Sequence, residues 1–155
     1  MGEVKVEGPG AAGFLNQTLT NDIRKLEIGQ GQYTILCNDR GGVVDDLYAY
    51  RLAQEDYLSS INASRIDEDT HWLEKQWSVF SQKDQVNLQN VSEQWGAIAV
   101  QGPRVVEFID ECFPGPSRGG TEVGKVSELK KNQVAKVTFN GNELCLLYTS
   151  DAADE

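Results

Sequence analysis

Two strand-forming segments joined by a short turn constrain this chain more than any other feature. Residues 32–37 and 43–52 are rich in β-branched, aromatic and aliphatic side chains, and Asn38-Asp39-Arg40-Gly41-Gly42 lies between them. Asn, Asp and Gly adopt the backbone conformations that tight turns need, so these segments predict a β-hairpin. Because side chains alternate between the two faces of a strand, the hairpin also determines which residues share a face.

The segments on either side of this hairpin predict further strands and helices. Alternating or continuous apolar patterns predict strands at residues 3–7, 57–61, 86–91 and 97–100. Helices are expected at residues 11–19, from Ser64 as an N-cap to Phe80, and after Gln101-Gly102-Pro103. Interleaved strands and helices with several antiparallel signals predict an α+β fold, with a mixed or antiparallel sheet and packed helices.

Composition narrows the classes of partner. The 155 residues carry a formal net charge of −10, which disfavours a protein that binds the phosphate backbone, so we expect no nucleic-acid partner. No apolar run approaches the roughly 20 residues that a membrane span requires, and the chain does not start like a secretory signal. We therefore expect a cytoplasmic protein with no membrane partner.

Cysteine and histidine usage disfavours metal and disulfide frameworks. The chain has three widely spaced cysteines, Cys37, Cys112 and Cys145, and one histidine, His71. His71 lies outside the apolar stripe of its predicted helix, so a solvent-facing position is expected. The sequence predicts no metal site.

Alternation in the second strand of the hairpin makes Asp46 the first candidate for chemistry. It shares a face with Tyr48 and Tyr50, whereas Asp45 points to the opposite face. If a four-residue loop joins the strands, Tyr33 lies directly opposite Asp46 on the same face. A partly desolvated carboxylate among aromatic rings can act as an acid, a base or an acceptor that orients a nitrogen-rich ring.

The alternatives for these carboxylates are structural. Asp46 could pair with Arg40 or Arg51, or face solvent at a sheet edge. Asp45 is expected to be a turn or surface carboxylate.

The end of the strand at residues 57–61 provides two further candidates. Asn62 could present an amide donor and acceptor to the edge of a heterocycle, with a local cap or turn as the alternative. Ser60 lies on the same face and could contribute a backbone contact, with a plain strand position as the alternative.

Several short segments occur together and carry a family resemblance. They are Leu19-Thr20-Asn21-Asp22, Gly31-Gln32-Tyr33-Thr34, residues 38–47, Asn62-Ala63-Ser64 and Ala99-Val100-Gln101-Gly102-Pro103. This combination resembles the folate-binding region of the glycine cleavage aminomethyltransferase (T protein) family. The resemblance covers about residues 1–113 and continues more weakly to Leu144.

The resemblance implies a fold, a reaction and a site. It implies a folate-binding domain in which Asp46 matches the essential aspartate and Tyr33, Ser60 and Asn62 contribute to the folate site. The whole enzyme would take an aminomethyl group from the lipoylated glycine cleavage H protein, transfer the carbon to tetrahydrofolate and release ammonia, with no metal.

Three alternatives remain open. The folate domain of a dimethylglycine or sarcosine dehydrogenase looks similar over the same region. A folate-binding protein that supports iron-sulfur enzymes or tRNA modification shares the fold without aminomethyl transfer. The third alternative is a folded fragment without catalytic activity.

Both ends of the chain look internal. Met1-Gly2-Glu3 resembles the middle of the family's Ser-His-Met-Gly-Glu segment, so residues 1–144 are expected to be a partial domain, truncated at both ends. Residues 145–155 can be back-translated into a transposase adapter used in sequencing libraries and are expected to be read-through. The family's later Gly-Tyr-Thr-Gly-Glu segment is absent, so the chain as written is expected to be inactive.

Overall fold

Two antiparallel sheets organise the chain in the computed structural model, which describes residues 1–148. The larger sheet has the strand order β2-β3-β4-β1-β5 and the smaller one β6-β7-β8. The strands are β1 (Gly2–Glu7), β2 (Gly31–Cys37), β3 (Val43–Ala53), β4 (Asp56–Ile61), β5 (Asn87–Asn90), β6 (Gly119–Gly120), β7 (Gln133–Phe139) and β8 (Asn142–Tyr148). The helices are α1 (Ala11–Thr18), α2 (Ile66–Val79) and α3 (Val105–Cys112), with single 3-10 turns at 23–25, 63–65, 83–85 and 126–128. The predicted α+β fold is confirmed.

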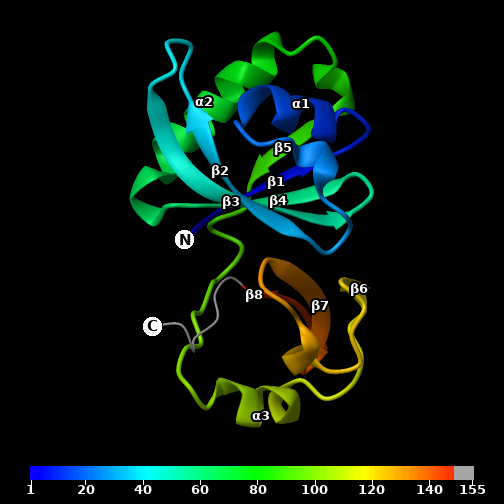
Figure 1. The fold of residues 1–155 in the computed structure, drawn as a ribbon. Helices are drawn as coiled ribbons and strands as arrows, with labels where there is room; N and C mark the ends of the chain where they lie inside the picture. The colour runs from blue at the N-terminus through cyan, green and yellow to red at the C-terminus, as the bar shows by residue number, and fades with distance from the viewer. Residues whose placement is uncertain (149–155) are drawn as a thin grey trace.

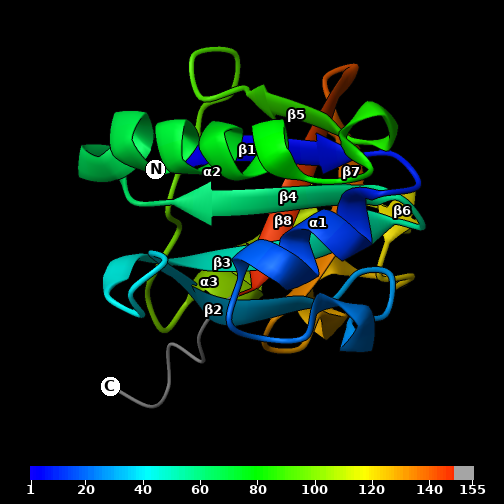
Figure 2. The same cartoon turned by 90° about the horizontal axis from the view of Figure 1, so that it is seen from above.

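Helices α1 and α2 cover one face of the larger sheet (Figures 1 and 2). Between them and the sheet lies the main hydrophobic core, to which α1 contributes Phe14 and Leu15 and α2 contributes Leu73. The strands complete this core with Val4, Val6, Leu36, Leu47, Ala49, Tyr57 and Ile61. Within each strand these residues are spaced by an even number of positions, so their side chains point to the same face of the sheet.

The smaller sheet packs against part of the opposite face. Tyr50, Leu52 and Leu58 of the larger sheet are buried together with Val134 of β7. The backbones also join, because Val134 N donates to Gly29 O at 2.8 Å. The larger sheet is therefore covered on both faces near Tyr50.

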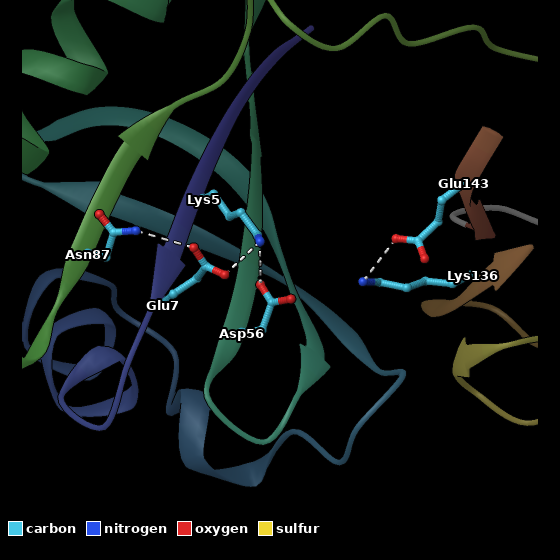
Figure 3. Close-up of polar contacts among 6 residues, drawn as sticks. All are labelled: Lys5, Glu7, Asp56, Asn87, Lys136 and Glu143. Carbon is cyan, nitrogen blue, oxygen red and sulfur yellow. Dashed lines mark hydrogen bonds and ion pairs between the residues drawn. The ribbon is translucent and has the colours of Figure 1, made fainter.

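Charged residues mark one end of that second face (Figure 3). Lys5 Nζ lies 2.6 Å from Glu7 Oε1 and 3.7 Å from Asp56 Oδ1. On the smaller sheet, Lys136 Nζ of β7 lies 3.3 Å from Glu143 Oε1 of β8. Lys5 and Lys136 are thus each paired with carboxylates on their own sheet.

Two predicted elements differ from the structure. Ser64 is not the N-cap of α2, because residues 63–65 form a 3-10 turn and the helix starts at Ile66. Residues 97–100 form no strand, and the Ile98 side chain is 89% exposed. Apolar alternation favours a strand only where a neighbouring strand provides partners, and the backbone leaves the sheet after β5.

The C-terminal hairpin joins β7 and β8 through a turn at Asn140 and Gly141. Asn140 and Gly141 have φ values of 50° and 81°, the positive values that two-residue hairpin turns favour. Residues 145–148 complete β8, whereas residues 149–155 lie outside the described residues. The assignment of residues 145–155 to adapter read-through stays a prediction.

Within residues 1–148 the three cysteines are free thiols, and no group of three or more His, Cys, Asp or Glu side chains could hold a metal ion. None of the helices described is long and apolar enough to cross a membrane. His71 is exposed on α2, as its position outside the stripe predicted.

Gly31 allows Tyr50 to lie flat against the neighbouring strand. The two residues pair across β2 and β3, and a Cβ at position 31 would collide with the Tyr50 ring, which is 1% exposed. We predict that Gly31→Ala lowers the free energy of unfolding by about 1–3 kcal/mol because the ring must move. Urea unfolding at constant pH measures this change.

Gly13→Ala is the matched control. A Cβ there would lie 3.6 Å from Phe80 Cζ, an ordinary contact, and removing a helical glycine should raise stability by about 0.5–1 kcal/mol. Equal losses in the two variants would contradict the packing role of Gly31.

Candidate functional site

The register of the β2–β3 hairpin differs from the prediction. Tyr33 pairs with Tyr48, so it does not lie directly opposite Asp46. Cys37 pairs with Val43, so the loop has five residues instead of four, and the pairing shifts by one more residue between Leu36 and Cys37. The predicted shared face is nevertheless kept.

Tyr33 and Asp46 are diagonal neighbours on that face, and their side chains are hydrogen-bonded. The hydrogen bond to the Asp46 carboxylate, together with its charge, raises the pKa of the Tyr33 phenol. The Asp46 side chain is exposed and Tyr33 is 47% exposed, so the partial burial predicted for Asp46 is wrong. The smaller sheet covers the Tyr50 end of this face and leaves the Asp46 end open.

Three tyrosine rings connect the open part of this face to its buried part. The Tyr33 and Tyr48 centroids are 5.8 Å apart in an edge-on arrangement, and the Tyr48 and Tyr50 rings stack at 5.8 Å. Burial of Tyr50 raises the pKa of its phenol. The inner ring is thus an apolar support for the two outer rings, which offer aromatic surface beside Asp46.

Ser60 continues this row on β4 and is buried. It pairs with Tyr48 on one side and with Glu3 on the other, and its Oγ donates to Glu3 Oε1 at 3.3 Å. Burial raises the pKa of the Glu3 carboxyl group. A polar residue alternating with valines normally faces solvent, so sequence reasoning missed Glu3. The ligand contact predicted for the Ser60 backbone stays a prediction.

Asn62 joins the end of β4 to β3. Its Nδ2 lies 3.0 and 3.1 Å from the two carboxylate oxygens of Asp45 and 3.2 Å from the backbone oxygen of Asp46. Asp45 is 9% exposed, so its predicted role as a turn or surface carboxylate is wrong. The amide donor of Asn62 therefore holds both members of the Asp45-Asp46 pair.

Asp69, in the first turn of α2, completes this arrangement. Its side chain is fully buried, and a side-chain hydrogen bond connects it with Asp45. Burial, followed by the interaction with Asp45, raises the pKa of Asp69 to about 7. Burial also opposes ionisation of Asp45, but hydrogen bonds from Asp69 and Asn62 lower its pKa overall. Sequence analysis placed no candidate at Asp69, because an acidic first turn is common in helices.

Two shallow hollows lie away from these residues. One is lined by Phe113, Arg118 and Val137, and the other by residues 116–119 and 122–124. Neither includes Tyr33 or Asp46. The exposure of Asp46 and Tyr33 makes the candidate site an open surface on the described part of the chain.

The fold is that of an aminomethyltransferase domain. The structure aligns with the crystal structure of glycine cleavage system aminomethyltransferase T from Bartonella henselae with a TM-score of 0.65 and 29% identity, covering 86% of this chain and 32% of that chain. The family model of the GCVT N-terminal domain matches residues 1–141. The chain belongs to this family.

Curated relatives agree with this assignment. The chain is 46% identical over 112 residues to an aminomethyltransferase of Oceanobacillus iheyensis, covering 72% of this chain and 30% of the relative. It is 39% identical over 150 residues to an aminomethyltransferase of Bdellovibrio bacteriovorus, covering 96% of this chain and 38% of the relative. The chain thus spans about a third of the length of the curated relatives that it matches.

The contact between Tyr33 and Asp46 can be tested by titration. We predict that Asp46→Asn lowers the pKa of Tyr33 toward the ordinary phenol value of about 10, because the charged acceptor is removed. NMR of ring-labelled tyrosines as a function of pH measures the shift. Asp67→Asn, which changes an exposed carboxylate on α2, should leave Tyr33 as it is. An unchanged Tyr33 midpoint in Asp46→Asn would refute the contact.

Proposed function

We propose that this chain carries the tetrahydrofolate-binding region of an aminomethyltransferase of the glycine cleavage system. The whole enzyme would transfer the one-carbon unit from the aminomethyl-lipoyl group of the H protein to tetrahydrofolate and release ammonia. Membership of the GCVT N-terminal domain family supports this proposal. The observation that carries it is the exposed Asp46 carboxylate beside Tyr33 at the uncovered end of the sheet face.

Asp46 is the catalytic residue of this proposal. Its carboxylate can accept a hydrogen bond from a ring N–H and so orient a pterin, and its negative charge favours the positive charge that develops on an aminomethyl carbon. Its exposure keeps it accessible to a ligand.

Tyr33, Ser60 and Asn62 form the rest of the proposed folate site. The Tyr33 ring offers an aromatic face or edge to a flat ligand, and Tyr48 holds that ring in place. Asn62 fixes the end of β3 through its bonds to Asp45 and Asp46. Ser60 of β4 lies on the same face and pairs with Tyr48 of β3.

The names of the curated relatives favour a transferase over the folate domain of a dehydrogenase or a folate-binding protein without transferase activity. In this proposal the partners are tetrahydrofolate and the lipoylated H protein, no metal takes part, and the protein acts in the cytoplasm.

We further propose that the 155 residues have little transferase activity alone. The chain covers 30% of the Oceanobacillus relative and 38% of the Bdellovibrio relative, and the candidate site is open on the described part. Closure of an active site excludes water and positions the reactants, so an open surface should bind weakly. Turnover is expected to stay below about a tenth of that of a version extended to the length of its relatives. Side-by-side assays with tetrahydrofolate and aminomethylated H protein decide this point, and a tenth or more of the turnover of the extended version would contradict it.

Substitution of the two neighbouring aspartates separates catalysis from structure. In the extended version, Asp46→Asn should lower turnover by about 10²- to 10⁴-fold and change the free energy of unfolding by less than about 0.5 kcal/mol, because the group is exposed. Asp45→Asn should lower stability by about 1–3 kcal/mol and turnover much less, because it disturbs a buried acceptor. Turnover per folded molecule and urea unfolding are the measurements. Equal losses of turnover would contradict the assignment of the two carboxylates to different faces.

A further inference from the structure

A buried pair of carboxyl groups lies on the face of β3 opposite to the Asp46 side chain. Asp69 is fully buried, and neither of its carboxyl oxygens accepts a hydrogen bond from an N–H or O–H group of a described residue. The group within hydrogen-bonding reach is the carboxyl group of Asp45. Two carboxylates can share a buried site only if one of them carries a proton, because like charges at contact repel strongly. The protonated Asp69 therefore donates to the Asp45 carboxylate.

The surroundings of the pair explain which member keeps the proton. Asn62 Nδ2 donates to both oxygens of the Asp45 carboxylate, which stabilises the charged form of Asp45. Arg65, on the turn before α2, is the nearby cation, and its guanidinium lies 3.5 Å from Glu68 and donates to a backbone oxygen. The charge of Arg65 favours the ionised form of Asp69, whereas the charge of Glu68, which Arg65 contacts, favours the protonated form.

A continuous chain of hydrogen bonds results. It runs from Asp69 to Asp45, from Asp45 to the amide of Asn62, and from that amide to the backbone oxygen of Asp46. The chain connects the first turn of α2 with the end of β4 and with the exposed end of β3. It passes from the helical face of the sheet to the residue that carries the candidate site.

We propose that Asp69 is a positioning residue of the candidate folate site, whose shared proton fixes Asp45 and thereby holds Asn62 and the Asp46 end of β3 in place. The geometry stands by itself, whereas the consequence for ligand binding rests on the proposed function. Loss of the shared proton leaves two negative charges in a buried site, which opens the hydrogen-bond chain. Burial raises the pKa of Asp69 to about 7, so this opening occurs near neutral pH.

The sign of the effect on stability follows from this direction. An acid whose pKa is higher in the folded than in the unfolded chain binds more protons when folded. Its contribution to stability is present below the ordinary carboxyl pKa of 3.8 and is lost as the pH rises through about 7. Weaker ordering of Asn62 should accompany this loss.

NMR of the Asn62 side-chain amide tests the positioning role in the 155-residue chain without any ligand. In the unaltered chain we expect the amide signals to shift with a midpoint near pH 7, between pH 5 and 9. In Asp69→Asn the midpoint should disappear and the signals should stay near their low-pH positions, because the new amide donates to Asp45 at every pH. Asp67→Asn, an exposed neighbour on the same turn, should titrate like the unaltered chain.

Tetrahydrofolate binding in the same proteins tests the consequence for the site. If only the protonated pair binds well, the affinity of the unaltered chain and of Asp67→Asn should fall up to about thirtyfold between pH 6 and pH 8.5. The affinity of Asp69→Asn should stay within about twofold over that range, because its donor does not titrate.

Each outcome is decisive. An Asn62 amide that titrates in Asp69→Asn as it does in the unaltered chain, or that does not titrate in the unaltered chain, overturns the proposal. Absence of tetrahydrofolate binding at both pH values would count against the proposed function of this chain. The titration of the Asn62 amide would still decide the role of Asp69. If Asp69→Asn does not fold, Asp69→Ser replaces it, because its hydroxyl group can also donate to Asp45 and does not titrate, and it should likewise abolish the midpoint.

Discussion

The position of β3 between β2 and β4 is the constraint on which the rest of the structure depends. A strand paired on both sides cannot rotate, so neighbouring residues must point to opposite faces. Asp45 consequently faces the helices, where it is buried, and Asp46 faces the open side beside Tyr33. Two adjacent carboxylates of the same type thus occupy different environments and can serve structure and chemistry separately.

The helical face supports the open face through Asn62. Its single amide nitrogen contacts the Asp45 carboxylate and the Asp46 backbone, so the buried pair and the exposed carboxylate share one connection. Asp69 enters this arrangement because α2 begins at Ile66 and packs its first turn against β3. The sheet is covered on both faces near Tyr50, so the accessible end of β3 is the one that carries Asp46.

Sequence reasoning predicted the local elements well and the contacts between them less well. The strands around the turn at 38–42, the apolar face of α2 and the shared face of Tyr33 and Asp46 all follow from side-chain periodicity. The predicted register was wrong because the loop is one residue longer than assumed and because an irregularity between Leu36 and Cys37 leaves no trace in that periodicity. The strand expected at residues 97–100 was wrong because its propensity has no paired neighbour to act on.

The sequence by itself determined the alternation, the turn and the family segments, since these depend on residues close together along the chain. Only the tertiary structure decided that Asp45 is buried and that Asp69 meets it, because their contact joins a strand and a helix separated by β4. The environment of a carboxyl group depends on what packs over it, and burial and a neighbouring charge arise only when distant segments come together. For the same reason the exposure of Asp46 follows from where the smaller sheet ends and not from the residues around it.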